Sequence, residues 1–535
     1  MITRALGAAL VAAFLAVGAG AATPETPERG GTLILARPPI NCLNPFGSCD
    51  LITRGVLSQV LEGAYEPGPD FAPQPYLVSG VSIGKDRVTL TYHIRSKATW
   101  NDGVPVSAAD FGFTYRMYST HESEPGTREL YGRIRRFRAL DAKTFVIELS
   151  EPFADWQEFF YEVLPQHALA GEDITAVWRD RVDNPKTGRP IGDGPFLASR
   201  LESDRQLTLI RSPAYWGRHP AYLDRIILRF NTIDAADPLG ALRRNEIDFV
   251  LLSGGPLAGR APEVRRLPGW RVASWPALAD EHLVFRIGPG GHPALKSKLV
   301  RRALAYGIDR VEIARRVNAE LGRRARPLDS AVYLAGESSY RPNWGVYRYD
   351  PARARRLLEE AGCTRGADGI YSCGGERLQL RFVTTAGAAA REQVLQLIEA
   401  QLRQAGVDVQ PVYVPFSAFF STVLPGGNFD AALFSWIGVT GGSTVPEAKC
   451  GDEGNFAGYC SRLTMRDVQQ VDRVVDPSQR ARLLNGLDLK LVRDVPILPL
   501  FQPAQQAALK KTLKGWMPGG TVGNVEQNED WWLKR

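Results

Sequence analysis

The chain has 535 residues, of which 44% are hydrophobic and 23% are charged. This is an ordinary globular composition, and the length exceeds what one hydrophobic core supports, so we expect roughly three domains. Lys and Arg outnumber Asp and Glu by 65 to 58, giving a formal charge of +7, and no basic stripe is interleaved with aromatic residues. Composition therefore argues against nucleic-acid binding.

The first residues have the pattern of a secretory signal peptide. Arg4 supplies a positive charge, residues 5–17 form a short apolar run, and Ala19-Gly20-Ala21 offers a cleavage site between small residues. The apolar run is too short for a stable membrane anchor, which is the alternative interpretation, and no cysteine lies at the cleavage point. We predict a signal peptide over residues 1–21 and a soluble periplasmic protein without a lipoprotein anchor.

The periodicity of apolar residues predicts alternating strands and helices along the exported part of the chain. The first half should contain a helix over residues 107–118 and strands over 30–36, 88–94, 144–149, 206–210 and 225–230. The second half should contain one helical face over 300–314, a helix over 350–362, strands over 378–384, 407–414 and 429–436, and a helix over 388–405. The strand–helix–strand unit within residues 378–414 predicts a parallel sheet in an α/β fold.

The six cysteines fall into three pairs that are close in sequence: Cys42 with Cys49, Cys363 with Cys373, and Cys450 with Cys460. An even number of closely paired cysteines in an exported chain favours three local disulfides. Zinc binding is the alternative, but no C-x-x-C occurs and no histidine lies at zinc-site spacing from a cysteine. We predict three disulfides, no metal site and no cofactor.

The motifs of common exported enzymes are absent from the sequence. There is no H-E-x-x-H, no G-x-S-x-G and no P-loop, and Gly192-Asp193-Gly194 is followed by Pro195, which breaks the G-x-G-x-x-G pattern. Glycosidases need two carboxylates that converge from different segments, which a sequence does not reveal. We therefore predict a protein that is not an enzyme, with an exported hydrolase as the rival class.

One distinctive block runs from Trp100 to Phe111, with the sequence W-N-D-G-V-P-V-S-A-A-D-F. Further blocks lie at residues 29–33, 43–45, 192–196, 211–217, 245–248, 300–310, 349–354 and 429–436. Together, and in this order, these segments resemble the extracellular solute-binding proteins of family 5, which serve peptide, nickel and opine importers. The resemblance covers nearly all of the exported chain. We expect the block at Trp100 to be structural, with Trp100 in the core and Asp102-Gly103 in a turn.

The resemblance implies an α/β protein with the two-lobed periplasmic-binding-protein type II fold of the large three-domain class. Domain I would be discontinuous and would cover residues 22–66, 187–287 and 500–535. Domain II would cover 67–186, and domain III, the second lobe, would cover 288–499. The two crossings between the lobes would then lie near Ile287 and Leu500.

The resemblance also implies candidate ligand residues. Peptide binders of the family fix the peptide amine with an aspartate three residues after the tryptophan of the ligand-facing strand. That tryptophan corresponds to Trp436, for which a core position is the alternative; the third residue after it is Val439, and Thr440 follows. Trp275 and Asp50 lie in segments that border the family's cleft. A buried ammonium without a counter-charge is costly, so Val439 predicts weak binding of di- and tripeptides with a free amine unless another acid, Asp50 or Asp280, replaces the aspartate.

The function that the resemblance implies is that of an extracytoplasmic substrate-binding protein of an ABC importer. It would capture an oligopeptide or a peptide-like solute by hinge closure, as a monomer, and deliver it to the membrane subunits of an ABC permease. A ligand sensor or scaffold of the same fold without a transport role is one alternative, and an exported hydrolase is the other.

Overall fold

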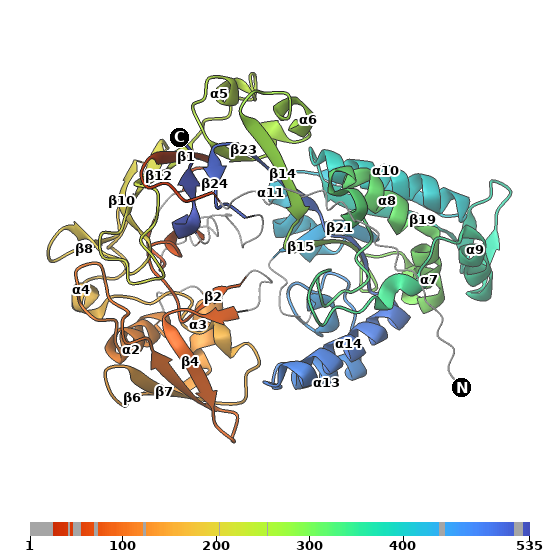
Figure 1. Cartoon of the computed structure of the whole chain (residues 1–535). Coiled ribbons are helices and arrows are strands. Elements are labelled where there is room, and N and C mark those ends of the chain that lie inside the picture. The colour runs from red at the N-terminus through yellow and green to blue at the C-terminus, as the bar shows by residue number, and fades with distance from the viewer. Residues whose placement is uncertain are drawn as a thin grey trace, which may run out of the picture.

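The computed structural model describes residues 25–40, 43–46, 55–68, 73–120, 125–202, 204–253, 255–437, 445–517 and 528–535. The described elements form two lobes, one built around a seven-stranded sheet and the other around a five-stranded sheet (Figure 1). Strands and helices alternate through much of both lobes. This arrangement agrees with the predicted two-lobed α/β fold.

The seven-stranded sheet of lobe one joins segments from three parts of the chain. Its order is β10 (Phe196–Glu202), β11 (Gln206–Arg211), β12 (Arg225–Phe230), β1 (Thr32–Arg37), β13 (Phe249–Leu251), β23 (Ala504–Lys510) and β14 (Trp270–Pro276). The central strand β1 pairs in parallel with β12 and β13. Apolar residues of the short helices α5 (Gly240–Arg243) and α6 (Ala261–Val264) pack with Ala36, Val250 and Ala508 from this sheet.

A smaller antiparallel sheet completes lobe one. Its order is β4 (Val78–Ile83), β5 (Thr89–Ile94), β7 (Thr144–Leu149) and β6 (Ile134–Ala139). Around it lie α2 (Ala108–Tyr118), α3 (Pro125–Gly132), α4 (Gln166–Leu169), the hairpins β2 (Tyr65–Pro67) with β3 (Pro73–Pro75) and β8 (Asp183–Asn184) with β9 (Arg189–Pro190), and the 3-10 turn η1 (Trp156–Glu158). One apolar cluster runs through both sheets and includes Leu33, Trp100 and Phe111, so the block at Trp100 is structural as predicted.

The turn and the helix start inside that block have a clear physical origin. Gly103 has φ +89°, a conformation that glycine adopts without the steric cost of a side chain, so the turn predicted there is confirmed. The backbone N–H of Ser107 donates to the carboxylate of Asp110 at 2.8 Å, which satisfies a donor at the start of α2. This turn and cap hold Trp100 in the core of lobe one.

Lobe two is organised around five strands. Their order is β20 (Asp408–Val414), β19 (Gln379–Thr385), β21 (Ala431–Ile437), β15 (Ala279–Phe285) and β22 (Ile497–Phe501). The described helices of this lobe include α7 (Lys298–Gly307), α8 (Arg310–Val317), α9 (Pro351–Glu360), α10 (Ala389–Gln404), α13 (Arg462–Val471) and α14 (Pro477–Asp494). The unit β19–α10–β20 has parallel strands, which confirms the predicted strand–helix–strand unit.

One helix prediction was wrong. The helical face expected over residues 300–314 is divided between α7 and α8, because the chain leaves the helix at Ile308. The side chain of Asp309 accepts a hydrogen bond from the backbone N–H of Glu312 at 2.9 Å and so caps a new helix. The reorientation leaves Val311 50% exposed, although its spacing placed it on the apolar face.

The chain passes between the lobes twice within the described residues. β14 belongs to the seven-stranded sheet and β15 to the five-stranded sheet, so the first crossing lies at Ala277-Leu278 rather than near Ile287. β15 pairs along its whole length with β21, which fixes it in lobe two. The return crossing follows Phe501, the last residue of β22. The N–H of Ala277 donates to the carbonyl of Pro503 at 2.8 Å, so the two crossing segments are bonded to each other.

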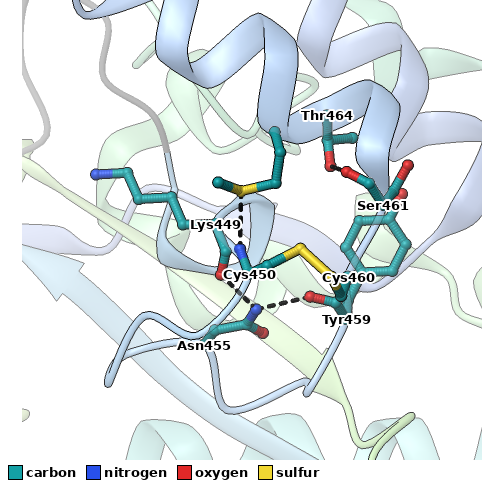
Figure 2. Close-up of a disulfide and its surroundings, with 8 residues drawn as sticks. Lys449, Cys450, Asn455, Tyr459, Cys460, Ser461 and Thr464 are labelled. Carbon is teal, nitrogen blue, oxygen red and sulfur yellow. Dashed lines mark hydrogen bonds between the residues drawn. A yellow bond between two sulfur atoms is a disulfide. The ribbon is translucent and has the colours of Figure 1, made fainter.

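Two of the three predicted disulfides lie in lobe two and are confirmed. Cys363 and Cys373 face each other across β16 (Cys363–Arg365) and β17 (Tyr371–Cys373). Cys450 and Cys460 close a loop in which the Asn455 amide donates to two backbone carbonyls, both at 2.7 Å (Figure 2). Loops of this length stabilise a fold by about 2–3 kcal/mol each in the chain-entropy model. Cys42 and Cys49 lie outside the described residues.

Candidate functional site

Three parallel strands of lobe two end at a common edge, where β19, β20 and β21 finish at Thr385, Val414 and Ile437. Open α/β sheets bind ligands beyond the carboxyl ends of their strands. A helical segment follows β20 and contains α11 (Phe416–Ala418), a π-helical turn (Phe419–Val423) and α12 (Leu424–Gly426). Figure 1 shows α11 on the side of lobe two nearest to lobe one, the side on which the chain passes from β14 into β15.

Five aromatic side chains form a continuous series at this edge. We call Phe416, Phe420, Phe434, Trp436 and Phe456 the aromatic row. Successive ring centroids lie 5.7, 5.9, 5.2 and 6.1 Å apart. The row begins at the surface, where Phe416 is 68% exposed, and reaches the core at the fully buried Phe434; the ring of Trp436 is half-buried. It offers aromatic faces on which an apolar or aromatic part of a ligand could pack.

An acid–histidine cluster lies behind the aromatic row. It consists of Asp280, His282 and Glu447, which are 4%, 0% and 0% exposed. In the pairing of β15 with β21, Asp280 is opposite Trp436 and His282 is opposite Phe434, so both side chains share the face of the row. The Nδ1 atom of His282 lies 2.8 Å from the Asp280 carboxylate, and its ring lies 6.2 Å from the ring of Trp436.

The charges of the acid–histidine cluster follow from its burial. Burial alone would lower the pKa of His282, but the nearby carboxylates of Asp280 and Glu447 outweigh it and raise that pKa. Burial raises the pKa of Glu447 to about 7, against the opposing effect of His282. Neither carboxylate oxygen of Glu447 makes a hydrogen bond of normal geometry to a described residue, and the nearby Trp436 side chain only partly opposes the rise in its pKa. Asp280 therefore favours the protonated form of His282, burial raises the pKa of Asp280 itself, and Glu447 beside them titrates close to neutral pH.

Replacement of Glu447 by glutamine should change how stability depends on pH. An acid whose pKa is higher in the folded than in the unfolded state stabilises the folded protein while it is protonated. This stabilisation is fully present below the unfolded-state pKa of 4.5 and is lost as the pH rises through the folded-state pKa of about 7. Between pH 4 and pH 9, Glu447→Gln should therefore gain about 3 kcal/mol in the free energy of unfolding relative to the wild type. Urea unfolding of both proteins at the two pH values measures the difference. An equal offset at both pH values would contradict the raised pKa.

The opposite face of the same two strands carries a separate ion pair. The guanidinium of Arg391 donates to the Glu281 carboxylate at 2.8 Å, and the hydroxyl of Ser435 donates to the same carboxylate. Glu281 is 4% exposed and Arg391 lies in the first turn of α10. This contact ties α10 to β15 and β21 and so fixes the strand that carries Trp436.

The predicted ligand residues fall into three groups. Trp436 lies half-buried in the aromatic row. Trp275 is 5% exposed and packs in the core of lobe one, with its ring 5.5 Å from that of Trp516. Asp50, Val439 and Thr440 lie outside the described residues. Ligand contacts of all five residues stay predictions.

Sequence reasoning did not find most of the acid–histidine cluster. A signal for Asp280 and His282 was available in the sequence, because residues two positions apart on a strand place their side chains on the same face. Glu447 gave no such signal, because tertiary structure brings it to the strand from η7 (Pro446–Ala448). Among the described residues, no group of His, Cys, Asp and Glu side chains is arranged to hold a metal ion. None of the helices in the described ranges is long and apolar enough to cross a membrane.

Comparison with known proteins places these features in a family. The profile of the bacterial extracellular solute-binding proteins, family 5, matches residues 72–445. The oligopeptide-binding protein OppA of Mycobacterium tuberculosis H37Rv is 29% identical over 511 residues, which cover 92% of this chain and 83% of OppA.

Solved structures show the same fold. The periplasmic EDTA-binding protein EppA has a TM-score of 0.80 at 20% identity and covers 96% of this chain and 98% of its own. AppA of Bacillus subtilis, in complex with a nonapeptide, has a TM-score of 0.69 at 19% identity over 95% of this chain and 100% of its own. The chain belongs to the bacterial extracellular solute-binding proteins of family 5.

Proposed function

We propose that this protein is the extracytoplasmic binding component of an ABC importer that captures an oligopeptide or a peptide-like solute and delivers it to a membrane permease. The observation that carries the proposal is the aromatic row with Trp436, which lies at the carboxyl edge of the lobe-two sheet, where Trp436 pairs with Asp280 just after the first interlobe crossing. OppA, which is similar along most of its length, is named as an oligopeptide-binding protein, and this supports a peptide-like ligand.

The mechanism is hinge closure around the two crossing segments. A ligand that contacts both lobes binds the closed arrangement more tightly than the open one, and its differential affinity shifts the equilibrium toward closure. The permease would then bind the closed shape. Binding and release require no covalent change in the ligand.

The positions of the acidic side chains support a ligand that places no free amine in this site. By the family resemblance Val439 corresponds to the acid that the family's peptide binders use, and the acids Asp280 and Glu447, which lie near Trp436, are buried beside His282. An ammonium buried in the site without a carboxylate partner would lose its hydration, and a charged hydrogen bond returns only about 1.5–3 kcal/mol. An N-blocked peptide, a longer peptide whose amine leaves the site, or a non-peptide solute fits better.

Two measurements test the function and the ligand class. Mass spectrometry of compounds released by denaturing the purified exported protein identifies what it carries. Calorimetry then compares free-amine tripeptides with their N-acetylated counterparts, and we expect at least tenfold tighter binding of the blocked series, equivalent to about 1.4 kcal/mol. Sub-micromolar binding of several free-amine tripeptides would contradict the role given to Val439. Turnover of the bound compound would instead favour a hydrolase.

A further inference from the structure

The two lobes touch a second time, away from the crossing segments. In lobe one the contact is made by residues 151–158, which end in η1. In lobe two it is made by residues 472–480, which connect α13 to the first turn of α14. Figure 1 shows α13 and α14 at the bottom of lobe two, whereas the crossing strands β14 and β23 lie near the top.

The contact is centred on an ion pair between Asp155 and Arg480. One guanidinium nitrogen of Arg480 lies 2.6 Å from Oδ1 of Asp155, and the other donates to Oδ2 at 2.9 Å. The Arg480 side chain is 14% exposed and that of Asp155 is 34% exposed. A two-point guanidinium–carboxylate contact with this burial is stronger than an ordinary surface ion pair.

Three further contacts surround this pair. The backbone N–H of Ala154 donates to the carbonyl of Asp472 at 2.9 Å. Val475 packs against the apolar core of lobe one although it belongs to lobe two in sequence. The guanidinium of Arg473 lies 2.7 Å from the Glu151 carboxylate, but both side chains are well exposed, so this second ion pair contributes little. Polar, charged and apolar contacts therefore coincide in one small interface.

A rotation of the lobes about the crossings would move these groups apart farther than groups near the crossings, because they lie far from the rotation axis. We propose that Asp155 and Arg480, with the Ala154–Asp472 hydrogen bond and the Val475 contact, form an interlobe latch that stabilises the closed arrangement. The latch raises the affinity for a ligand between the lobes, since closure is then partly favoured before binding. The proposal rests on hinge closure as part of the proposed function but not on the identity of the ligand.

The test measures closure directly, in the full exported chain without added ligand. Spin labels are placed at Leu140→Cys in lobe one and Leu463→Cys in lobe two, which are 50% and 53% exposed. Double electron–electron resonance then gives the populations of short and long interlobe distances. Asp155→Asn and Arg480→Gln should each increase the ratio of long to short distances roughly threefold to tenfold.

Two controls separate the latch from general effects of charge. Arg482→Gln removes an exposed arginine from the same helix, two residues away, and should leave the distance populations unchanged. The double variant Asp155→Arg with Arg480→Asp reverses the pair and should restore most of the short-distance population. Unchanged populations in both single variants, or identical effects of Arg480→Gln and Arg482→Gln, would overturn the latch. This result would leave the transport proposal intact, because ligand capture is measured separately.

Discussion

Trp436→Ala should lower the affinity for the compound that copurifies with the protein by about thirtyfold, or roughly 2 kcal/mol, which is typical of an aromatic residue at the centre of a binding site. The substitution removes the half-buried ring between Phe434 and Phe456 and leaves the rest of the aromatic row in place. Because Trp436 is not fully buried, the melting temperature should fall by only a few degrees. Calorimetry with the identified compound and a thermal melt measure the two effects.

A control removes a more exposed apolar side chain from another part of lobe two. Leu489 on α14 is 49% exposed, and Leu489→Ala should change neither affinity nor melting temperature appreciably. If Trp436→Ala folds normally and binds as tightly as the wild type, Trp436 is a framework residue and the binding site lies elsewhere.

The local elements were predictable from sequence because their signals are local. β7 (Thr144–Leu149) and β12 (Arg225–Phe230) have the expected bounds, since alternating apolar residues and flanking turns determine both. The expected helical face over 300–314 failed for an equally local reason. Its apolar spacing continues through Ile308, but the capping side chain of Asp309 starts a second helix there.

The organisation of the lobes depends on contacts that no local pattern encodes. All seven residues of β15 are buried, so its burial does not indicate which sheet it joins, and its pairing with β21 and β22 moves the first crossing to Ala277-Leu278. The latch joins Asp155 to Arg480, which are 325 residues apart. The acid–histidine cluster likewise needs Glu447 from a distant segment. The candidate site was therefore predictable at Trp436, through the family resemblance, and not at the groups that support it.

Trp100→Ala and Trp436→Ala should have opposite effects: the first should lower stability and leave ligand affinity unchanged, and the second should lower affinity with little loss of stability. Trp100 is fully buried in the apolar cluster that connects both sheets of lobe one. Trp100→Ala should reduce the free energy of unfolding by about 3–5 kcal/mol, because it removes buried area and leaves a cavity. Its neighbour Asn101 also holds the segment in place, since its backbone N–H donates to the carbonyl of Gly192 at 2.9 Å and its side-chain oxygen accepts from the N–H of Gly192 at 2.9 Å.

Urea unfolding measures this loss, with Lys85→Ala at an exposed position of the same lobe as the control. The fraction of Trp100→Ala that remains folded should bind the copurifying compound with unchanged affinity, because the ring lies inside lobe one and not at the lobe-two edge. A large loss of affinity without a loss of stability would show that the W-N-D-G block contacts ligand. A loss of stability with retained affinity would show that Trp100 stabilises the fold and that the ligand binds elsewhere, as we assign it, at the lobe-two edge.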